Sequence, residues 1–101
     1  MKCYLGVDVG TGSVRCGAFD IEGTLLSEPI VKSIKIFNPK DNFFQQSSVD
    51  IWETVCNVVR QTVVNMNLEV LGIGFDATCS LVNLDENDVG ISIDSDEGLR
   101  G

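Results

Sequence analysis

The fold of this chain is decided by the stretch Gly6-Val7-Asp8-Val9-Gly10-Thr11-Gly12-Ser13-Val14-Arg15. Apolar or aromatic residues flank it on both sides and glycines interrupt its middle, which predicts a strand, a tight turn and a second strand. We expect the first strand over about residues 3–9 and the second over about 13–21, with Asp8 near the end of the first. Glycines in the turn permit positive φ and let a ligand approach the peptide N–H groups closely.

The turn has the composition of a phosphate-binding site. Consecutive N–H groups in such a turn form an anion-binding concavity. Thr11 and Ser13 add hydroxyl donors, and Arg15 adds a fork of donors suited to a phosphate. Asp8 would repel a phosphate unless a cation or a reacting proton lies between them. The pattern therefore predicts a phosphate site with a cation, and a plain hairpin with a glycine turn is the alternative.

Three other glycine or aspartate motifs do not match. The P-loop requires a lysine directly after its last glycine, and no lysine follows these glycines. The dinucleotide-binding pattern has Arg15 where its third glycine should stand. Aspartic proteases carry Asp-Thr-Gly, whereas this chain has Asp8-Val9-Gly10 and lacks the threonine.

Composition narrows the class of protein. With 101 residues and 44% hydrophobic residues, the chain is long enough for one globular domain. Four cysteines without a C-x-x-C pair predict free, buried thiols, and the absence of histidine leaves only a hard cation on oxygen ligands. A net charge of −8 argues against nucleic-acid binding. No apolar run is long enough for a bilayer and no signal peptide is visible, so we expect a cytoplasmic protein.

Further along the chain, a third strand is expected over about residues 25–34, and Pro29 predicts that it lies at a sheet edge. Residues 37–46 read as a loop. A helix then begins at Ser47 or Ser48, either of which can cap its first turn. Its buried face is predicted from apolar residues at helical spacing: Ile51, Val55, Val58, Val59, Thr62 and Met66. Trp52 is interpreted as a core or interface aromatic, with a ligand platform as the alternative.

A fourth strand over about residues 70–77 repeats the pattern of the first, because each strand has glycines and a late aspartate on one face. A strand, a crossover helix and another strand normally pair in parallel. Asp8 and Asp76 would then meet at the carboxyl ends of the strands, where open α/β sheets bind ligands. The alternative is that Asp76 only caps a turn.

The last part of the chain is acidic. A short strand is expected over residues 80–84, and residues 85–90 are interpreted as a turn rather than a calcium loop, because Val89 stands where an oxygen ligand is required. We therefore divide the chain into a domain over residues 1–84 and an acidic, flexible tail over 85–101. One helix cannot cover both faces of a sheet, so the domain is expected to be truncated.

These residues resemble the FGGY carbohydrate kinases, which belong to the actin-like ATPase superfamily. The first stretch looks like the first phosphate motif of that superfamily. The stretches 44–52, 72–80 and 81–85 narrow the resemblance to the ribulokinase branch, in particular to the D-ribulose kinases. The resemblance implies an α/β fold: a ribonuclease-H-like N-terminal subdomain with a three-stranded meander, a helix and a parallel strand.

The resemblance also implies ATP and Mg²⁺ as cofactors. Asp8 would orient the magnesium through water, and Arg15 would touch the transferring phosphoryl group. The phosphates would be held by the turn residues Gly10, Thr11, Gly12 and Ser13. The sugar pocket would be lined by Gln46, Asp76, Thr78 and Ser80.

Some family features are missing. Glutamate is usual where Gln45 stands, and the Trp-x-Asp-x-Arg stretch, the catalytic base and the adenine-binding domain are absent. We therefore expect the N-terminal part of an ATP-dependent pentulose kinase, inactive by itself. Its expected partners are the sugar substrate and the missing C-terminal kinase domain, with a homodimer as a further alternative. The alternative functions are a non-catalytic fragment with residual phosphate or partner binding, and another actin-like ATPase.

Overall fold

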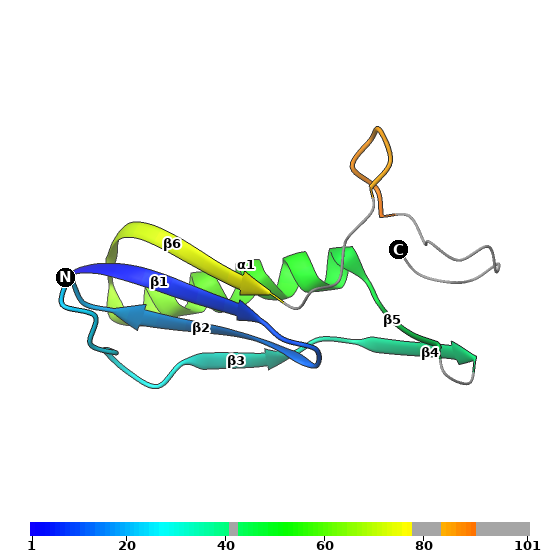
Figure 1. Ribbon diagram of the computed structural model, residues 1–101. Coiled ribbons are helices and arrows are strands. Elements are labelled where there is room, and N and C mark those ends of the chain that lie inside the picture. Colours follow the sequence, from blue (N-terminus) through cyan, green and yellow to red (C-terminus); the bar gives the residue numbers. More distant parts are fainter. Residues whose placement is uncertain (41–42, 78–83, 91–101) are drawn as a thin grey trace.

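The computed structural model describes residues 1–40, 43–77 and 84–90. Within these residues the chain forms a four-stranded sheet of order β3-β2-β1-β6, a two-stranded sheet of β4 and β5, and one helix, α1 (Figure 1). The elements are β1 (Lys2–Val9), β2 (Ser13–Phe19), β3 (Ile30–Ser33), β4 (Ile36–Lys40), β5 (Phe43–Gln46), α1 (Ser48–Met66) and β6 (Glu69–Ala77).

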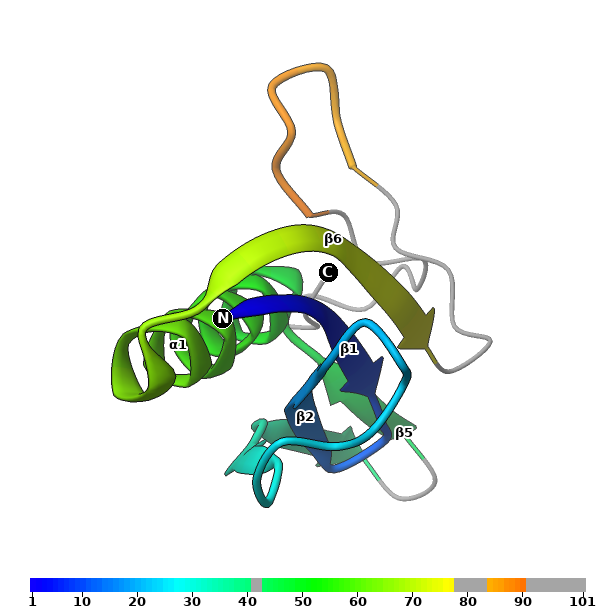
Figure 2. The ribbon, with the colours of Figure 1, turned by 90° about the vertical axis from the view of Figure 1, so that its left-hand side faces the viewer.

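The core lies between α1 and one face of β1 and β2, as Figure 2 shows end-on. Side chains in a strand alternate between the two faces, so every second residue of these strands is buried. The buried residues are Cys3, Leu5 and Val7 on β1, and Val14, Cys16 and Ala18 on β2. Facing them from α1 are Val55 and Val58. The first two strands expected from the sequence are thus confirmed.

The helix begins where the sequence predicts it. Ser47 is the N-cap, and its Oγ accepts a hydrogen bond from the backbone N–H of Asp50 at 3.3 Å. Asn67 ends the helix in the left-handed conformation with φ of 50°. Trp52 is 63% exposed, so it is not a core aromatic, and its interpretation as an interface aromatic stays a prediction.

The segment between β2 and α1 differs from the expectation. The third strand is shorter than predicted, because β3 begins only after Pro29, which has no N–H to donate to a ladder. It does lie at the edge of the sheet, as Pro29 indicated. The loop predicted for residues 37–46 is wrong. Residues there form the antiparallel pair β4 and β5, in which Lys40 pairs with Phe43 across a short connection.

Strand β6 lies parallel to β1, at the opposite edge of the sheet from β3. This confirms the predicted parallel strand and the α/β fold with one crossover helix. Residues 84–90 form the predicted turn, in which the Asp85 carboxylate accepts hydrogen bonds from the N–H groups of Asn87 and Val89. The strand expected over residues 80–84 lies outside the described residues except for Leu84, and residues 91–101 of the acidic tail also lie outside them.

Cys3, Cys16 and Cys56 are free thiols, and the first two are buried as expected, whereas Cys79 lies outside the described residues. Burial raises the pKa of the Cys16 thiol, although a hydrogen bond with Thr62 acts in the opposite direction. Cys3 and Cys16 are therefore part of the core, whereas Cys56 is only half-buried, so the expected burial is wrong for that thiol. Across the described part of the chain, no helix combines the length and hydropathy needed to cross a membrane.

Candidate functional site

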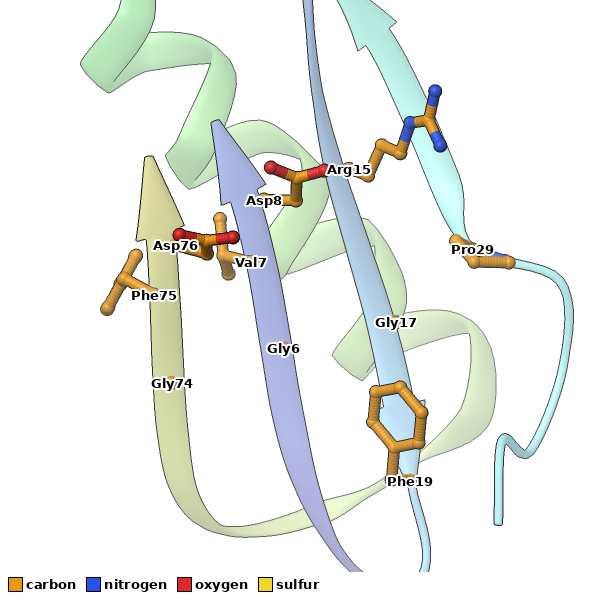
Figure 3. A pocket seen from close by; sticks show the side chains of 10 residues that line it. All are labelled: Gly6, Val7, Asp8, Arg15, Gly17, Phe19, Pro29, Gly74, Phe75 and Asp76. Carbon is orange, nitrogen blue, oxygen red and sulfur yellow. The ribbon is translucent and has the colours of Figure 1, made fainter. Parts of the chain in front are cut away.

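Two carboxylates meet at the carboxyl ends of β1 and β6. Asp8 is directly opposite Asp76 in the parallel register of these strands, and both side chains are exposed. Figure 3 shows the two carboxylates on the same face of the sheet. The juxtaposition that the sequence predicts is therefore present, and it arises because α1 returns the chain to the edge strand beside β1.

A positively charged side chain lies next to Asp8 on β2, the neighbouring strand on the side away from β6. Arg15 on β2 is opposite Asp8 in the antiparallel register, so its side chain is on the same face. Figure 3 shows its guanidinium group directed toward β3, away from the two carboxylates. Three adjacent strands thus present two carboxylates and one guanidinium group along one face. This combination of charges suits a ligand that carries phosphates together with a cation.

A shallow hollow of about 440 Å³ lies beside these side chains. Gly6, Gly17 and Gly74, one from each of three adjacent strands, lie side by side along it. The side chain of Phe19 lies over Gly6 and Gly17, because a Cβ at either position would come within 3.4 Å of its ring. Phe19 lies at the end of the hollow away from the two aspartates, and Pro29 lies at its side, next to β3 (Figure 3). A Cβ atom added at Gly74 would meet no atom within 4 Å and would project into open space.

Sequence reasoning missed Gly17, Phe19 and Pro29 as neighbours of the site. The signal that could have found Gly17 is the register of the hairpin, which pairs it with Gly6. Phe19 would have followed by parity, because residues two apart on a strand share a face. Pro29 has no local signal, since its position depends on the path of the chain between β2 and β3.

The glycine turn is closed by a hydrogen bond from the N–H of Gly10 to the carbonyl of Ser13 at 2.8 Å. Gly10 and Gly12 do not use the positive φ that glycine permits, because Gly23 is the positive-φ glycine among the described residues. The absence of a side chain at these two glycines is what shapes the turn. A Cβ at Gly10 would lie 3.3 Å from the Ser13 carbonyl oxygen, and a Cβ at Gly12 would meet nothing within 4 Å. The turn is therefore open to a ligand at Gly12.

Of the residues predicted to bind sugar, Asp76 lies in the site and Gln46 lies next to the turn. The side-chain amide of Gln46 donates a hydrogen bond to the carbonyl oxygen of Thr11. Thr78 and Ser80 lie outside the described residues. The contact of Gln46 with the turn was not predicted, because the two segments are 35 residues apart in the sequence.

The donor set at the strand ends fits magnesium. Mg²⁺ keeps several waters and is bound through one or two carboxylates together with substrate phosphates. Asp8 and Asp76 supply two exposed carboxylates, and the glycine turn follows Asp8 directly. Within residues 1–40, 43–77 and 84–90 there is no cluster of three or more acidic or cysteine side chains that could hold a metal by itself. A phosphate-bound, largely hydrated cation is the kind that this site can hold.

Known proteins share both the sequence and the fold. Over 84 residues the chain is 50% identical to the D-ribulokinase of Saccharomyces cerevisiae, an alignment that covers 80% of this chain and 12% of the enzyme. Over 86 residues it is 49% identical to the FGGY carbohydrate kinase domain-containing protein of Homo sapiens, covering 84% of this chain and 15% of the relative. The chain thus spans 12–15% of the length of these curated relatives.

No protein-family model matches the chain. Among solved structures, the ligand-bound xylulose kinase of Lactobacillus acidophilus superposes with a TM-score of 0.84, covering 91% of this chain and 19% of that protein at 19% identity. That likeness shows that the fold is shared, and the identity of about 50% to the relatives above shows common descent. The chain belongs to the FGGY carbohydrate kinase family and matches the N-terminal portion of its members.

Proposed function

We propose that this chain supplies the phosphate-binding turn and the magnesium-orienting carboxylate of an ATP-dependent sugar kinase. The observation that carries the proposal is the register of β1 and β6, which brings Asp8 and Asp76 together beside the glycine turn. The sugar is a pentulose such as D-ribulose. Its support is the identity of 50% to an enzyme named for that substrate.

Each group has a role in the transfer. The carboxylate of Asp8 orients the waters of the bound cation, and the N–H and hydroxyl groups of residues 10–13 hold the β- and γ-phosphates. Arg15 contacts the transferring phosphoryl group, where charge spreads over the equatorial oxygens. Magnesium, when bound, neutralises the phosphate charge. Positioning and charge neutralisation supply most of the catalysis in such a transfer.

A second group of residues holds the sugar. We assign this role to Asp76, Thr78 and Ser80, whereas Gln46, which was expected beside the sugar, contacts the phosphate turn through Thr11. The general base and the adenine-binding domain are not among these 101 residues, so the chain alone is expected not to turn over. We further propose that the protein is cytoplasmic and that residues 1–84 are a partial N-terminal kinase domain, followed by the acidic segment over residues 85–101.

A chimeric enzyme, called the graft below, tests the proposal. The segment of this chain that aligns with the yeast D-ribulokinase replaces the enzyme's own segment, and ADP release is measured with D-ribulose, with other pentuloses and without sugar. The unmodified yeast enzyme and the Asp8→Asn graft are the controls. We expect sugar-dependent ADP release by the graft and little by its Asp8→Asn variant.

Two outcomes would contradict the proposal. ADP release that does not depend on sugar would favour another actin-like ATPase. A graft that matches the yeast enzyme in melting temperature and oligomeric state but releases no ADP would assign the chain to a non-catalytic fragment.

A further inference from the structure

Two hydrogen-bond donors, one just before β4 and one at the end of β5, contact the glycine turn from one side. The N–H of Ile34, just before β4, donates to the carbonyl of Gly12 at 3.1 Å. The side-chain amide of Gln46, at the end of β5, donates to the carbonyl of Thr11. Two successive carbonyls of the turn are therefore directed toward the same neighbouring segment.

This arrangement decides where the amide groups of the turn point. A trans peptide directs its N–H opposite to its C=O, and the described peptides are all trans. Because the carbonyls of Thr11 and Gly12 point toward the β4–β5 segment, the N–H groups of Gly12 and Ser13 point away from it. Consecutive N–H groups turned outward in this way form the concavity that binds an anion.

Gln46 itself is held in place by its neighbours. It directly precedes Ser47, which caps α1. The carboxylate of Asp50 in the first helical turn accepts a hydrogen bond from the N–H of Lys35 at 2.7 Å, which ties the start of α1 to the residue after Ile34. The backbone that carries Gln46 is thus anchored, while the two glycines of the turn by themselves allow many conformations.

We propose that Gln46 is a positioning residue, which orients the peptide groups of the Thr11-Gly12 turn so that their N–H groups face a phosphate. The inference rests on the proposed phosphate-binding role of this turn. Ile34 contributes a backbone donor, so of the two contacts only that of Gln46 can be removed by changing a side chain.

The first experiment uses the 101-residue chain. In the wild type, an NMR coupling across the hydrogen bond between Gln46 Nε2 and the Thr11 carbonyl carbon is measured directly. Gln46→Met removes the donor while keeping length and charge, and Gln61→Met on α1 is the matched control. We expect Gln46→Met to move the Gly12 and Ser13 amide resonances and to weaken the affinity for magnesium pyrophosphate about fivefold, the effect of one lost hydrogen bond. The control should do neither.

The second experiment uses the graft described above. Gln46→Met should raise the KM for ATP about fivefold and leave the KM for D-ribulose unchanged, because the residue acts through the phosphate turn. A raised KM for D-ribulose with an unchanged KM for ATP would overturn the inference and assign Gln46 to direct sugar binding. If the graft shows no kinase activity, the proposed function is wrong. The pyrophosphate titration of the 101-residue chain then still tests the inference about Gln46.

An absent coupling in the wild-type chain, or a pyrophosphate affinity equal in Gln46→Met and wild type, would overturn the inference. So would a wild-type chain that does not bind pyrophosphate.

Discussion

Strands β1 and β6 are parallel neighbours with the same sequence pattern and opposite surroundings. Leu5 and Val7 on β1 pair in register with Ile73 and Phe75 on β6, so all four lie on the same face of the sheet. Leu5 and Val7 are 2% exposed, whereas Ile73 is 45% and Phe75 is 60% exposed. The difference arises because α1 packs on β3, β2 and β1 and leaves the edge strand β6 largely uncovered (Figure 2).

A strand can therefore contribute a side chain to the site without contributing much buried apolar surface to stability. Both strands deliver an aspartate to the same sheet edge, because backbone pairing alone sets the register. Only β1 gains full burial of its apolar side chains, because burial requires a second layer. An apolar strand face that stays open is a surface that a partner would cover.

The largest expected effect comes from removing a covered side chain. Leu5→Ala should lower the free energy of unfolding by about 3 kcal/mol, because it leaves a cavity under α1. Ile73→Ala on the uncovered strand should cost less than about 1 kcal/mol, because nearly half of that side chain already contacts water. Urea unfolding of the two variants measures the difference. An equal cost would show that β6 is covered in solution, and sedimentation would then test for a second copy.

The next test asks whether the two aspartates differ in function as their strands differ in burial. In the graft, Asp8→Asn should lower kcat about 100-fold with little change in the KM for sugar, because it disturbs the water shell of the cation. Asp76→Asn should instead raise the KM for D-ribulose about tenfold through a lost charge-assisted hydrogen bond. Steady-state kinetics at saturating magnesium distinguishes the two. An unchanged kcat in Asp8→Asn would refute its role with the cation.

A smaller effect is expected in the turn that follows β1. Gly12→Ala should leave the fold intact, since a Cβ there meets nothing within 4 Å. It should weaken magnesium pyrophosphate binding about tenfold by blocking one charge-assisted hydrogen bond. Gly23→Ala is the opposite control. Gly23 has φ of 87°, so alanine there should cost about 1 kcal/mol of stability and leave binding unchanged. Loss of stability in Gly12→Ala would remove the basis for a ligand-accessible turn.

The smallest effect concerns the start of the helix that covers β1. Ser47→Ala should lower the free energy of unfolding by about 1 kcal/mol, because it removes the oxygen that accepts the Asp50 N–H. Ser48→Ala should cost almost nothing, since Ser48 already lies inside the helix. Thermal and urea unfolding of both variants are the measurements. Equal effects would mean that the cap is shared between the two serines.

Several features of the fold and the site could be predicted from the chain alone. The alternation of apolar residues gave the two central strands, the helical spacing gave the buried face of α1, and the repeated glycine and aspartate pattern brought Asp8 and Asp76 together. Other features could not be predicted in this way. The β4–β5 pair was read as a loop, because Asn38 and Pro39 in its sequence are typical of turns.

The amino-acid sequence by itself determined the elements whose signals are local: the glycine turn, the capped helix and the faces of the strands, because each depends on residues within a few positions of one another. Only the tertiary structure decided which of these faces is covered and which distant groups meet. The exposure of β6 depends on where α1 lies, and the bond from Gln46 to Thr11 depends on how the segment after β3 returns to the turn. Such contacts join segments far apart in the chain, and no local pattern encodes them.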